Sequence, residues 1–164
     1  MKKPYSYFAR AIRGGRENLE NSKIIVSEME KYSIVLSKHT VSNNVEKFEK
    51  EWRKKHPEMN VFQRDMKWLR MSKYFVADIT VESSGLGYEI CVAYERKIPM
   101  VLFSHENTRN RPTIRLHIEG KTMELTLEKL LDFHNIQIPT IFYNDENIKE
   151  IAEIEIRNLF TKRI

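Results

Sequence analysis

The stretch that decides the fold is residues 74–89, which read Tyr-Phe-Val-Ala-Asp-Ile-Thr-Val-Glu-Ser-Ser-Gly-Leu-Gly-Tyr-Glu. Its first half is an apolar, β-rich run, and its second half holds the small residues and glycines that suit a turn into a helix. A helical pattern follows over residues 86–96, and another β-rich run follows at 99–103. Strand, turn, helix and strand in this order predict a parallel βαβ unit.

The same alternation extends to both sides of this unit. Further strands are predicted at residues 5–9, 32–36 and 139–143, and further helices at 19–29, 45–52, 59–71 and 147–160. Residues 104–120 are less regular and suggest a charged loop at 106–111 and an edge strand at 113–118, followed by a short helix at 125–133. We therefore predict an α/β protein: a single doubly wound, mainly parallel five-stranded sheet with helices on both faces, of the Rossmann-like type, forming one domain over residues 1–164.

Composition narrows the class of protein further. The chain has 164 residues, of which 41% are hydrophobic and 31% charged, and no apolar run is long enough for a membrane span. A single cysteine, Cys91, offers no intramolecular disulfide, which indicates a cytoplasmic protein with the nucleus as the alternative location. The net charge of +5 is compatible with an anionic partner, either a polymer or a small phosphate.

Two predicted strands end in segments that suit phosphate. Ile12-Arg13-Gly14-Gly15-Arg16 follows the first strand and leads into a helix, and Ser83, Gly85 and Gly87 follow the strand at 74–79. Glycines let a phosphate approach the main chain, helix starts present free N–H groups, and arginine binds phosphate with a bidentate fork. The alternative for each segment is an ordinary strand-to-helix turn.

Two carboxylates are candidates for chemistry. Glu89 falls near the start of a predicted helix, where the positive end of the helix favours the ionised form that a nucleophile needs. Asp65 lies close to the apolar stripe that Phe62, Met66 and Leu69 form in a helical projection. The alternatives are a surface Glu89 that complements the helix dipole and an Asp65 that pairs with Arg64 or Lys67. Two converging carboxylates would suffice to break a glycosidic bond.

Histidines and basic segments are less informative. His39 follows the strand at 32–36 and falls on the same side as the other strand ends, although a lone histidine is more often structural. The remaining histidines have no metal-like spacing with carboxylates, so no metal site is predicted. The basic residues 53–56 belong to a helix that also carries several glutamates, which indicates a solvated face and not a nucleic-acid interface.

These motifs together resemble a known family. Tyr7-Phe8, the segment 12–17, the helix around 65–69, the strand 76–78 and the element 83–89 occur in the same order in the 2'-deoxynucleoside 5'-phosphate N-hydrolases. That family is part of the wider nucleoside 2-deoxyribosyltransferase superfamily. The resemblance covers roughly residues 5–103, and little of the family pattern is recognisable beyond Ser104.

The resemblance implies a hydrolase that cleaves the bond between base and sugar in a nucleoside 5'-monophosphate, without a cofactor. It assigns the nucleophile to Glu89, positioning and proton transfer to Asp65, and a place beside the reacting sugar to Tyr7. It places His39 near the base. Residues matching the family's 5'-phosphate site are Ile12, Arg13, Gly14 and Ser83, close to Gly85 and Gly87. Family members are homodimers in which the neighbouring subunit helps to complete the phosphate site.

One departure from the family pattern bears on the substrate. Arg10 and Ala11 stand where the family has a glycine and a serine, so a long cation replaces a small residue near the predicted phosphate site. Arg10 is therefore an additional candidate for substrate binding. The alternative functions are a nucleoside 2-deoxyribosyltransferase, a ribonucleotide N-hydrolase of the cytidine monophosphate type and a non-catalytic nucleotide-binding module.

Overall fold

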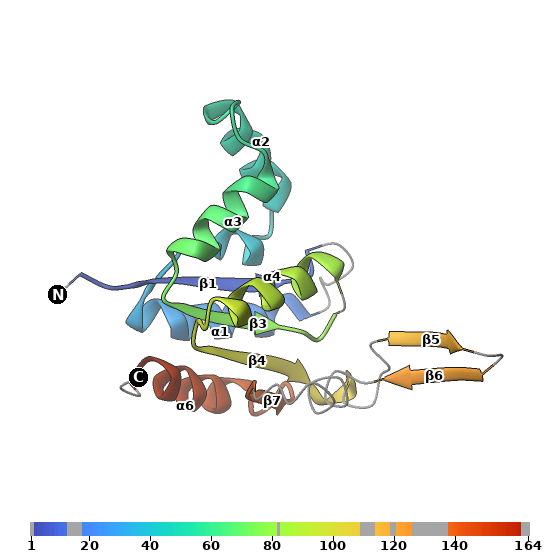
Figure 1. The fold of residues 1–164 in the computed structure, drawn as a ribbon. Helices are drawn as coiled ribbons and strands as arrows, with labels where there is room; N and C mark the ends of the chain where they lie inside the picture. The colour runs from blue at the N-terminus through green and yellow to red at the C-terminus, as the bar shows by residue number, and fades with distance from the viewer. Residues whose placement is uncertain are drawn as a thin grey trace.

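A five-stranded parallel sheet forms the centre of the protein. A computed structural model describes residues 2–12, 18–81, 83–108, 114–118, 121–125 and 138–161, with backbone only for 114–118 and 121–125. The strands are β1 (Tyr5–Arg10), β2 (Ile34–Val35), β3 (Tyr74–Asp78), β4 (Met100–His105) and β7 (Thr140–Tyr143). Their order is β2-β1-β3-β4-β7, and every neighbouring pair is parallel (Figure 1). The predicted fold class is confirmed, whereas a single domain over the whole chain stays a prediction.

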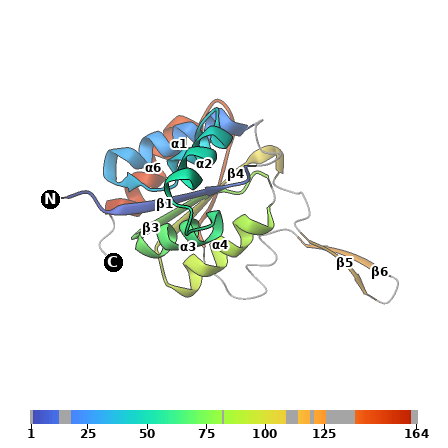
Figure 2. The ribbon, with the colours of Figure 1, turned by 90° about the horizontal axis from the view of Figure 1, so that it is seen from above.

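Helices cover both faces of this sheet. They are α1 (Leu19–Tyr32), α2 (Val45–Lys55), α3 (Val61–Met71), α4 (Ser84–Glu95) and α6 (Ile148–Thr161), with short 3-10 turns η2 (Lys38–Val41) and η3 (Glu106–Thr108). Seen from above, α1 and α6 lie on one side of the strands and α3 and α4 on the other (Figure 2). None of the helices in the described ranges has the length and apolar character that crossing a bilayer requires.

The two faces of the sheet build two separate hydrophobic cores. Consecutive side chains of a strand point to opposite faces, so Phe8 joins the core under α1 and α6, while Tyr7 and Ala9 join the core under α3 and α4. On β3 the same rule sends Val76 to the first core and Phe75 to the second. Strands buried on both faces explain why the sequence shows continuous apolar runs in place of alternation.

The strand order fixes where a ligand site is expected. From β1 the chain moves outward to β2 and then crosses to the other side to form β3, so the direction of winding reverses between β1 and β3. In open α/β sheets, a crevice forms at the carboxyl ends of the strands beside such a reversal. Residues after Arg10 and after Asp78 therefore lie at the preferred place for a site.

The region after β4 differs from the prediction in one respect. The strand expected near 113–118 is present as β5 (Ile114–Ile118), but it pairs antiparallel with β6 (Lys121–Leu125) in a separate two-stranded sheet. This hairpin projects from the end of the main sheet (Figure 1). Leu125 is the last residue of β6 and not the first of a helix, and the rest of the expected helix at 125–133 lies outside the described residues.

Replacing a fully buried strand residue should test the packing of the central sheet. Leu102 of β4 has no exposed surface, so Leu102→Ala removes apolar contacts on the α3 and α4 side and leaves a cavity. We expect the free energy of unfolding to fall by about 2–5 kcal/mol, measured by urea denaturation. The control is Ile154→Ala on α6, where 37% exposure predicts a much smaller loss. Equal losses for the two variants would contradict this packing.

Candidate active site

Tyr7 and Glu89 meet where β1 faces α4. The Tyr7 hydroxyl donates a hydrogen bond of 2.7 Å to Glu89 Oε1. The ring of Tyr7 is 2% exposed and stacks on Phe75 of β3, with 6.1 Å between ring centroids and an angle of 7° between their planes. Burial, followed by the charges of Glu89 and Asp65, raises the pKa of Tyr7 well above its ordinary value. The phenol therefore remains protonated at neutral pH and serves Glu89 as a fixed donor.

The electrostatic prediction for Glu89 is wrong. The pKa of Glu89 is raised to about 7: burial is the main cause, the hydrogen bond from Tyr7 opposes it, and the charge of Asp65 adds to it. Glu89 is the sixth residue of α4 and so lies in its second turn. The field of a helix end weakens beyond the first turn, which explains why desolvation prevails. Near pH 7, Glu89 exists in both the ionised and the protonated form.

Asp65 forms one of the ion pairs that the sequence left open, and it lies on α3. A capping box starts α3 at Val61: the Asn60 side chain accepts from the Gln63 amide, and the Gln63 side chain accepts from the Asn60 amide. Asp65 Oδ1 lies 2.9 Å from Arg64 Nε, so the expected ion pair is present. Burial raises the pKa of Asp65, and the charge of Arg64 opposes this shift. The negative charge of Asp65 nevertheless acts on Tyr7 and Glu89.

Phe62 does not belong to the inward stripe of α3. Met66 and Leu69 are buried as predicted, whereas the Phe62 side chain is 57% exposed. Its ring lies 5.7 Å from the ring of Tyr88, itself 49% exposed. The helical projection placed Phe62 in the stripe, but α3 rises away from the sheet at its amino-terminal end, so that its later turns reach the core (Figure 1).

His39 lies inside a cluster that sequence reasoning largely missed. This residue of η2 is 7% exposed, stacks on Phe48 at 4.3 Å between ring centroids, and meets Trp68 edge-on at 5.7 Å. Its Nε2 atom lies 3.2 Å from both Arg64 and Glu49. Burial, followed by the charge of Arg64, lowers the pKa of His39 to about 4, so the imidazole is neutral at pH 7. Periodicity in the sequence gave no signal for these contacts.

The predicted phosphate-binding residues are only partly described. Arg13 and Gly14 lie outside the described residues, and Ile12 before them is 41% exposed. Arg10 ends β1 opposite Asp78 and is 9% exposed. Ser83, Gly85 and Gly87 are exposed at the start of α4, where the Ser83 side chain makes no capping hydrogen bond. An added Cβ at Gly87 would meet nothing within 4 Å, so internal packing does not require this glycine.

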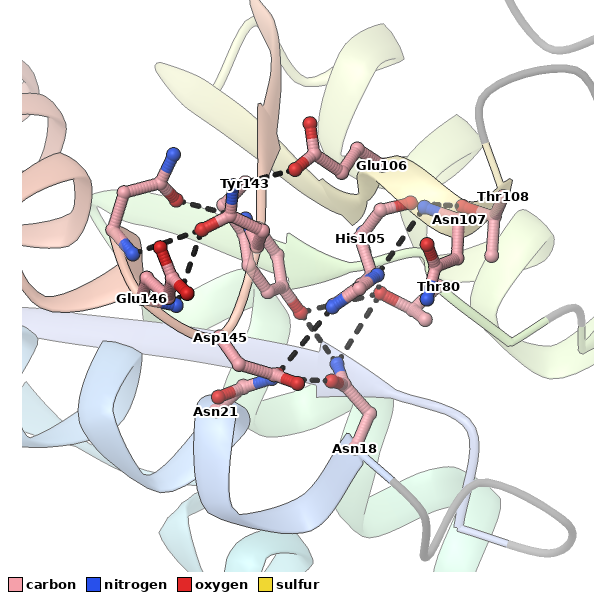
Figure 3. A network of polar contacts seen from close by, with 12 residues as sticks. Asn18, Asn21, Thr80, His105, Glu106, Asn107, Thr108, Tyr143, Asp145 and Glu146 are labelled. Atoms are coloured by element: carbon pink, nitrogen blue, oxygen red, sulfur yellow. Dashed lines mark hydrogen bonds and ion pairs between the residues drawn. The ribbon is translucent and has the colours of Figure 1, made fainter.

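A second polar network, which sequence patterns did not predict, lies at the other half of the strand ends. The Asp78 carboxylate accepts hydrogen bonds from Asn18, from Ser22 and from the Thr80 amide. The Asn18 amide also binds the Tyr143 hydroxyl, and Asn21 binds Asp145 (Figure 3). Burial, followed by the charge of Asp78, raises the pKa of Tyr143. These bonds tie the start of α1 to the ends of β3 and β7.

His105 extends this network toward η3. Its Nε2 lies 3.4 Å from Asp145, and its Nδ1 accepts from the Asn107 amide at 3.2 Å (Figure 3). Thr80 Oγ1 accepts from the His105 amide at 3.0 Å. Among the side chains described, no group of three or more His, Cys, Asp or Glu residues is arranged to hold a metal ion.

Two substitutions should move the pKa of Glu89 in opposite directions. Tyr7→Phe removes the donor that stabilises the ionised carboxylate, so the pKa should rise above about 7, whereas Asp65→Asn removes a repulsive charge and should lower it. The measurement is a pH titration of the glutamate carboxyl carbons by NMR. Glu95→Gln, on the exposed end of α4, is the control that should leave the Glu89 titration unchanged. Shifts of the same sign in the first two variants would contradict the geometry.

Comparison with curated proteins finds similar sequences. The chain is 38% identical over 96 residues to a Methanosarcina mazei protein named "Putative 2'-deoxynucleoside 5'-phosphate N-hydrolase 1", and this match covers 58% of the chain. The match spans only 57% of the archaeal protein's length. A protein of Esox lucius named 5-hydroxymethyl-dUMP N-hydrolase is 29% identical over 154 residues, which are 93% of this chain and 96% of that protein. No family model matches the chain.

A solved structure agrees with the fold. A conserved protein from Enterococcus faecalis superposes with a TM-score of 0.51 at 15% sequence identity, covering 93% of this chain and 99% of that one. At this identity the likeness concerns the fold alone. The sequence matches and the motifs from Tyr7 to Glu89 agree with each other. The resemblance to the family is thereby confirmed: this chain is a homologue of the 2'-deoxynucleoside 5'-phosphate N-hydrolases.

Proposed function

We propose that this protein hydrolyses the N-glycosidic bond of a nucleoside 5'-monophosphate, giving a free base and a sugar 5-phosphate. The observation that carries the proposal is the buried Tyr7 hydroxyl bonded at 2.7 Å to Glu89, with the charge of Asp65 acting on both. The similar proteins named above, which are called N-hydrolases of nucleoside 5'-phosphates, support the same reaction.

In the proposed reaction Glu89 is the nucleophile. Its free carboxylate oxygen attacks the anomeric carbon of the sugar, the bond to the base breaks, and the leaving base takes a proton that Asp65 helps to deliver. Water then attacks the anomeric carbon of the glycosyl ester and gives a proton to Asp65, which releases the sugar phosphate and restores the Glu89 carboxylate. Because Tyr7 binds Oε1, it holds one oxygen of Glu89 in place and leaves Oε2 for the attack.

The ionisation of Glu89 supports a role in this chemistry. Only the ionised carboxylate attacks carbon, and the transition state at the sugar carries positive charge that a nearby carboxylate stabilises. With a pKa of about 7, Glu89 is only partly ionised at neutral pH. Positive charge that develops on the bound sugar would favour the ionised form of Glu89. Burial therefore makes the carboxylate poorly solvated before the reaction and strongly attracted to the reacting carbon during it.

We place the 5'-phosphate between the end of β1 and the start of α4. Arg13, Gly14 and Ile12 would contribute from one side, and Ser83 with the first amides of α4 from the other. Gly85 and Gly87 are exposed, and internal packing does not require a glycine at position 87. This helix start is therefore open to a ligand. Arg10 would add a cation to the same region. Phosphate binding at a distance from the reacting carbon would orient the sugar.

We place the base near His39. Its Nδ1 is a buried atom with no hydrogen-bond partner among the described residues, so it is available to a polar edge of a bound base. The neutral imidazole suits contact with an uncharged heterocycle. The surrounding rings of Phe48 and Trp68 provide apolar surface of the kind on which bases stack.

Release of free base is the decisive measurement. Purified protein incubated with a panel of ribo- and deoxyribonucleoside monophosphates should release base from at least one, as seen by chromatography. Glu89→Gln should lower kcat by more than about 10²-fold while nucleotide binding persists, because the nucleophile is lost and the pocket is kept. Glu95→Gln on the same helix is the matched control and should keep full activity.

The same assay separates the alternative functions. A new nucleoside formed when a second free base is added would identify a deoxyribosyltransferase. Selective cleavage of ribonucleotides would identify a hydrolase of the cytidine monophosphate type. Tight nucleotide binding with no base release by the wild type would overturn the proposal and identify a nucleotide-binding module. Competition by inorganic phosphate distinguishes substrates held by their 5'-phosphate from free nucleosides.

We further propose that the protein is a cytoplasmic homodimer. The outer side of α4 carries an apolar surface that continues onto α3: Tyr88 and Tyr94 are 49% and 43% exposed, and Phe62 is 57% exposed beside Tyr88. The thiol of Cys91 is exposed on the same helix. Exposed apolar side chains gathered on one face favour burial against a second copy. Because Glu89 lies on α4, such a dimer would bring a partner close to the site.

Sedimentation velocity tests the dimer. We expect the wild-type protein to sediment as a dimer at micromolar concentration, and Tyr94→Lys to raise the dimer dissociation constant at least about tenfold by placing a charge in an apolar contact. Ile154→Lys on α6, in the opposite helix layer, is the matched control and should leave the dimer intact. A monomeric wild type, or dissociation caused only by the α6 variant, would contradict the assignment of this surface.

A further inference from the structure

One of the most deeply buried side chains in the described part of the protein is a cation. Arg64 of α3 is 1% exposed and is the largest fully buried side chain there. Burial of an unpaired charge costs many kcal/mol, so a buried guanidinium persists only where anions and hydrogen bonds replace its hydration. Arg64 directly precedes Asp65, the predicted helper carboxylate.

Two carboxylates from different helices bind Arg64. Glu49 of α2 accepts in bidentate fashion, with 3.0 Å from Nη1 to Oε2 and 2.8 Å from Nη2 to Oε1. Asp65 Oδ1 accepts from Nε at 2.9 Å and lies 2.8 Å from Nη2. The planar guanidinium therefore spans both carboxylates at once, which a lysine ammonium is not shaped to do.

Aromatic rings surround the same guanidinium. Its carbon lies 4.7 Å from the ring centroid of Trp68, 4.9 Å from that of Trp52 and 5.7 Å from that of Phe48, all within cation–π range. Trp52 and Trp68 are the only tryptophans of the chain. These rings cover the guanidinium, whose side chain is 1% exposed.

The cluster also explains how α2 is held near the site. Val45 is the one buried residue of this helix in the described structure, so few apolar contacts tie α2 to the rest of the protein. In Figure 1, α2 stands beyond α3 and away from the sheet. It contacts Arg64 of α3 through the bidentate bond from Glu49 and through the rings of Phe48 and Trp52.

From this arrangement we propose that Arg64 is a positioning residue: clamped by Glu49 and the aromatic rings, it fixes the Asp65 carboxylate toward Tyr7 and Glu89. The proposal rests on the function proposed above. Asp65 sits on a helix whose amino-terminal end is partly exposed, and its rotamer would otherwise be free to turn toward solvent. The Arg64 charge also opposes the rise in the pKa of Asp65 that burial causes. Through Glu49 and Arg64, α2 would thus contribute to the position of Asp65.

Stability alone does not account for this cluster. A buried ion pair gains little over apolar residues of similar size, because desolvation cancels most of its attraction. An arginine retained only to hold α2 against α3 would need Glu49 but would not need to bind Asp65 through Nε. The guanidinium of Arg64 donates both to Glu49 of α2 and to Asp65, so the same group holds α2 and orients Asp65.

The pH dependence of the proposed reaction involves the titratable groups that face Arg64 and Asp65. These are Glu49 from α2, His39 from η2, Tyr7 from β1 and Glu89 from α4. His39 is neutral at pH 7 and so adds no charge there. Loss of the Arg64 charge leaves three carboxylates close together, and the pair Asp65 and Glu89 should then hold a proton to higher pH.

The test compares four variants with the wild type. Arg64→Met removes the charge and the donors but keeps an apolar chain, Arg64→Lys keeps the charge and loses the fork, and Glu49→Gln keeps neutral acceptor and donor groups. Arg70→Met, an exposed arginine on the same helix, is the matched control. For each variant, kcat and KM are measured across pH for base release, thermal unfolding confirms the fold at the assay temperature, and NMR follows the Asp65 carboxyl carbon.

We expect Arg64→Met to lower kcat by about 10²-fold with a smaller change in KM, since the misplaced group acts in the transition state. Its acidic limb of kcat/KM should move to higher pH, and Asp65 should titrate at higher pH. Arg64→Lys should lose activity while keeping a pH profile close to that of the wild type, and Arg70→Met should match the wild type in every measurement.

The outcomes separate this proposal from the function itself. A folded Arg64→Met variant with wild-type kcat and an unmoved Asp65 titration would overturn the positioning role while base release by the wild type still stands. Should Arg64→Met fail to fold, Arg64→Lys and Glu49→Gln decide, and wild-type kcat in both would also overturn it. If the wild type releases no base, the proposed function fails, and the Asp65 titration alone then decides whether Arg64 controls that carboxylate.

Discussion

The arrangement of the site depends on the double-sided burial of the central strands. Because β1 and β3 have helices on both faces, each successive side chain must enter one of two cores. That alternation sends Tyr7 toward α3 and α4 and sends Phe8 toward α1 and α6. A shift of one residue in the register of β1 would turn Tyr7 away from Glu89. The hydrogen bond between them is thus a consequence of the pleat and of which helices cover which face.

Charge balance is the second feature that shapes the site. Glu89, Asp65 and Glu49 bring three carboxylates into a poorly hydrated region, and one guanidinium, Arg64, offsets part of their repulsion. Arg64 contacts Glu49 and Asp65 directly but not Glu89. The pKa of Glu89 is therefore raised to about 7, whereas at Asp65 the charge of Arg64 opposes the rise in pKa that burial causes. The two carboxylates therefore lie in different electrostatic environments.

The carboxyl edge of the sheet is divided into two halves with different chemistry. On the α3 and α4 side, Tyr7, Asp65 and Glu89 form a partly buried set with shifted pKa values. On the α1 and α6 side, the Asp78 network satisfies its polar groups with one another and ties α1 to β3 and β7. A ligand of an open α/β sheet binds at strand ends and helix starts. The Asp78 network would hold these segments in place beside the candidate carboxylates Asp65 and Glu89.

The sequence by itself determined the βαβ order, the β-strands that turned out to be buried on both faces and the identity of the candidate carboxylates. Apolar runs and helical periodicity are local properties, so the strands and helices could be predicted from the sequence. Sequence motifs made Glu89, Asp65 and Tyr7 candidates for the site. Tertiary structure alone decided the electrostatics. Glu89 lies in the second turn of α4, where the field of the helix end is weak, so burial raises its pKa. Phe62 lies outside the core because α3 tilts away from the sheet. The burial of Arg64 between α2 and α3 depends on groups distant in sequence, because the partners of a charge and its desolvation are set only when the chain is folded.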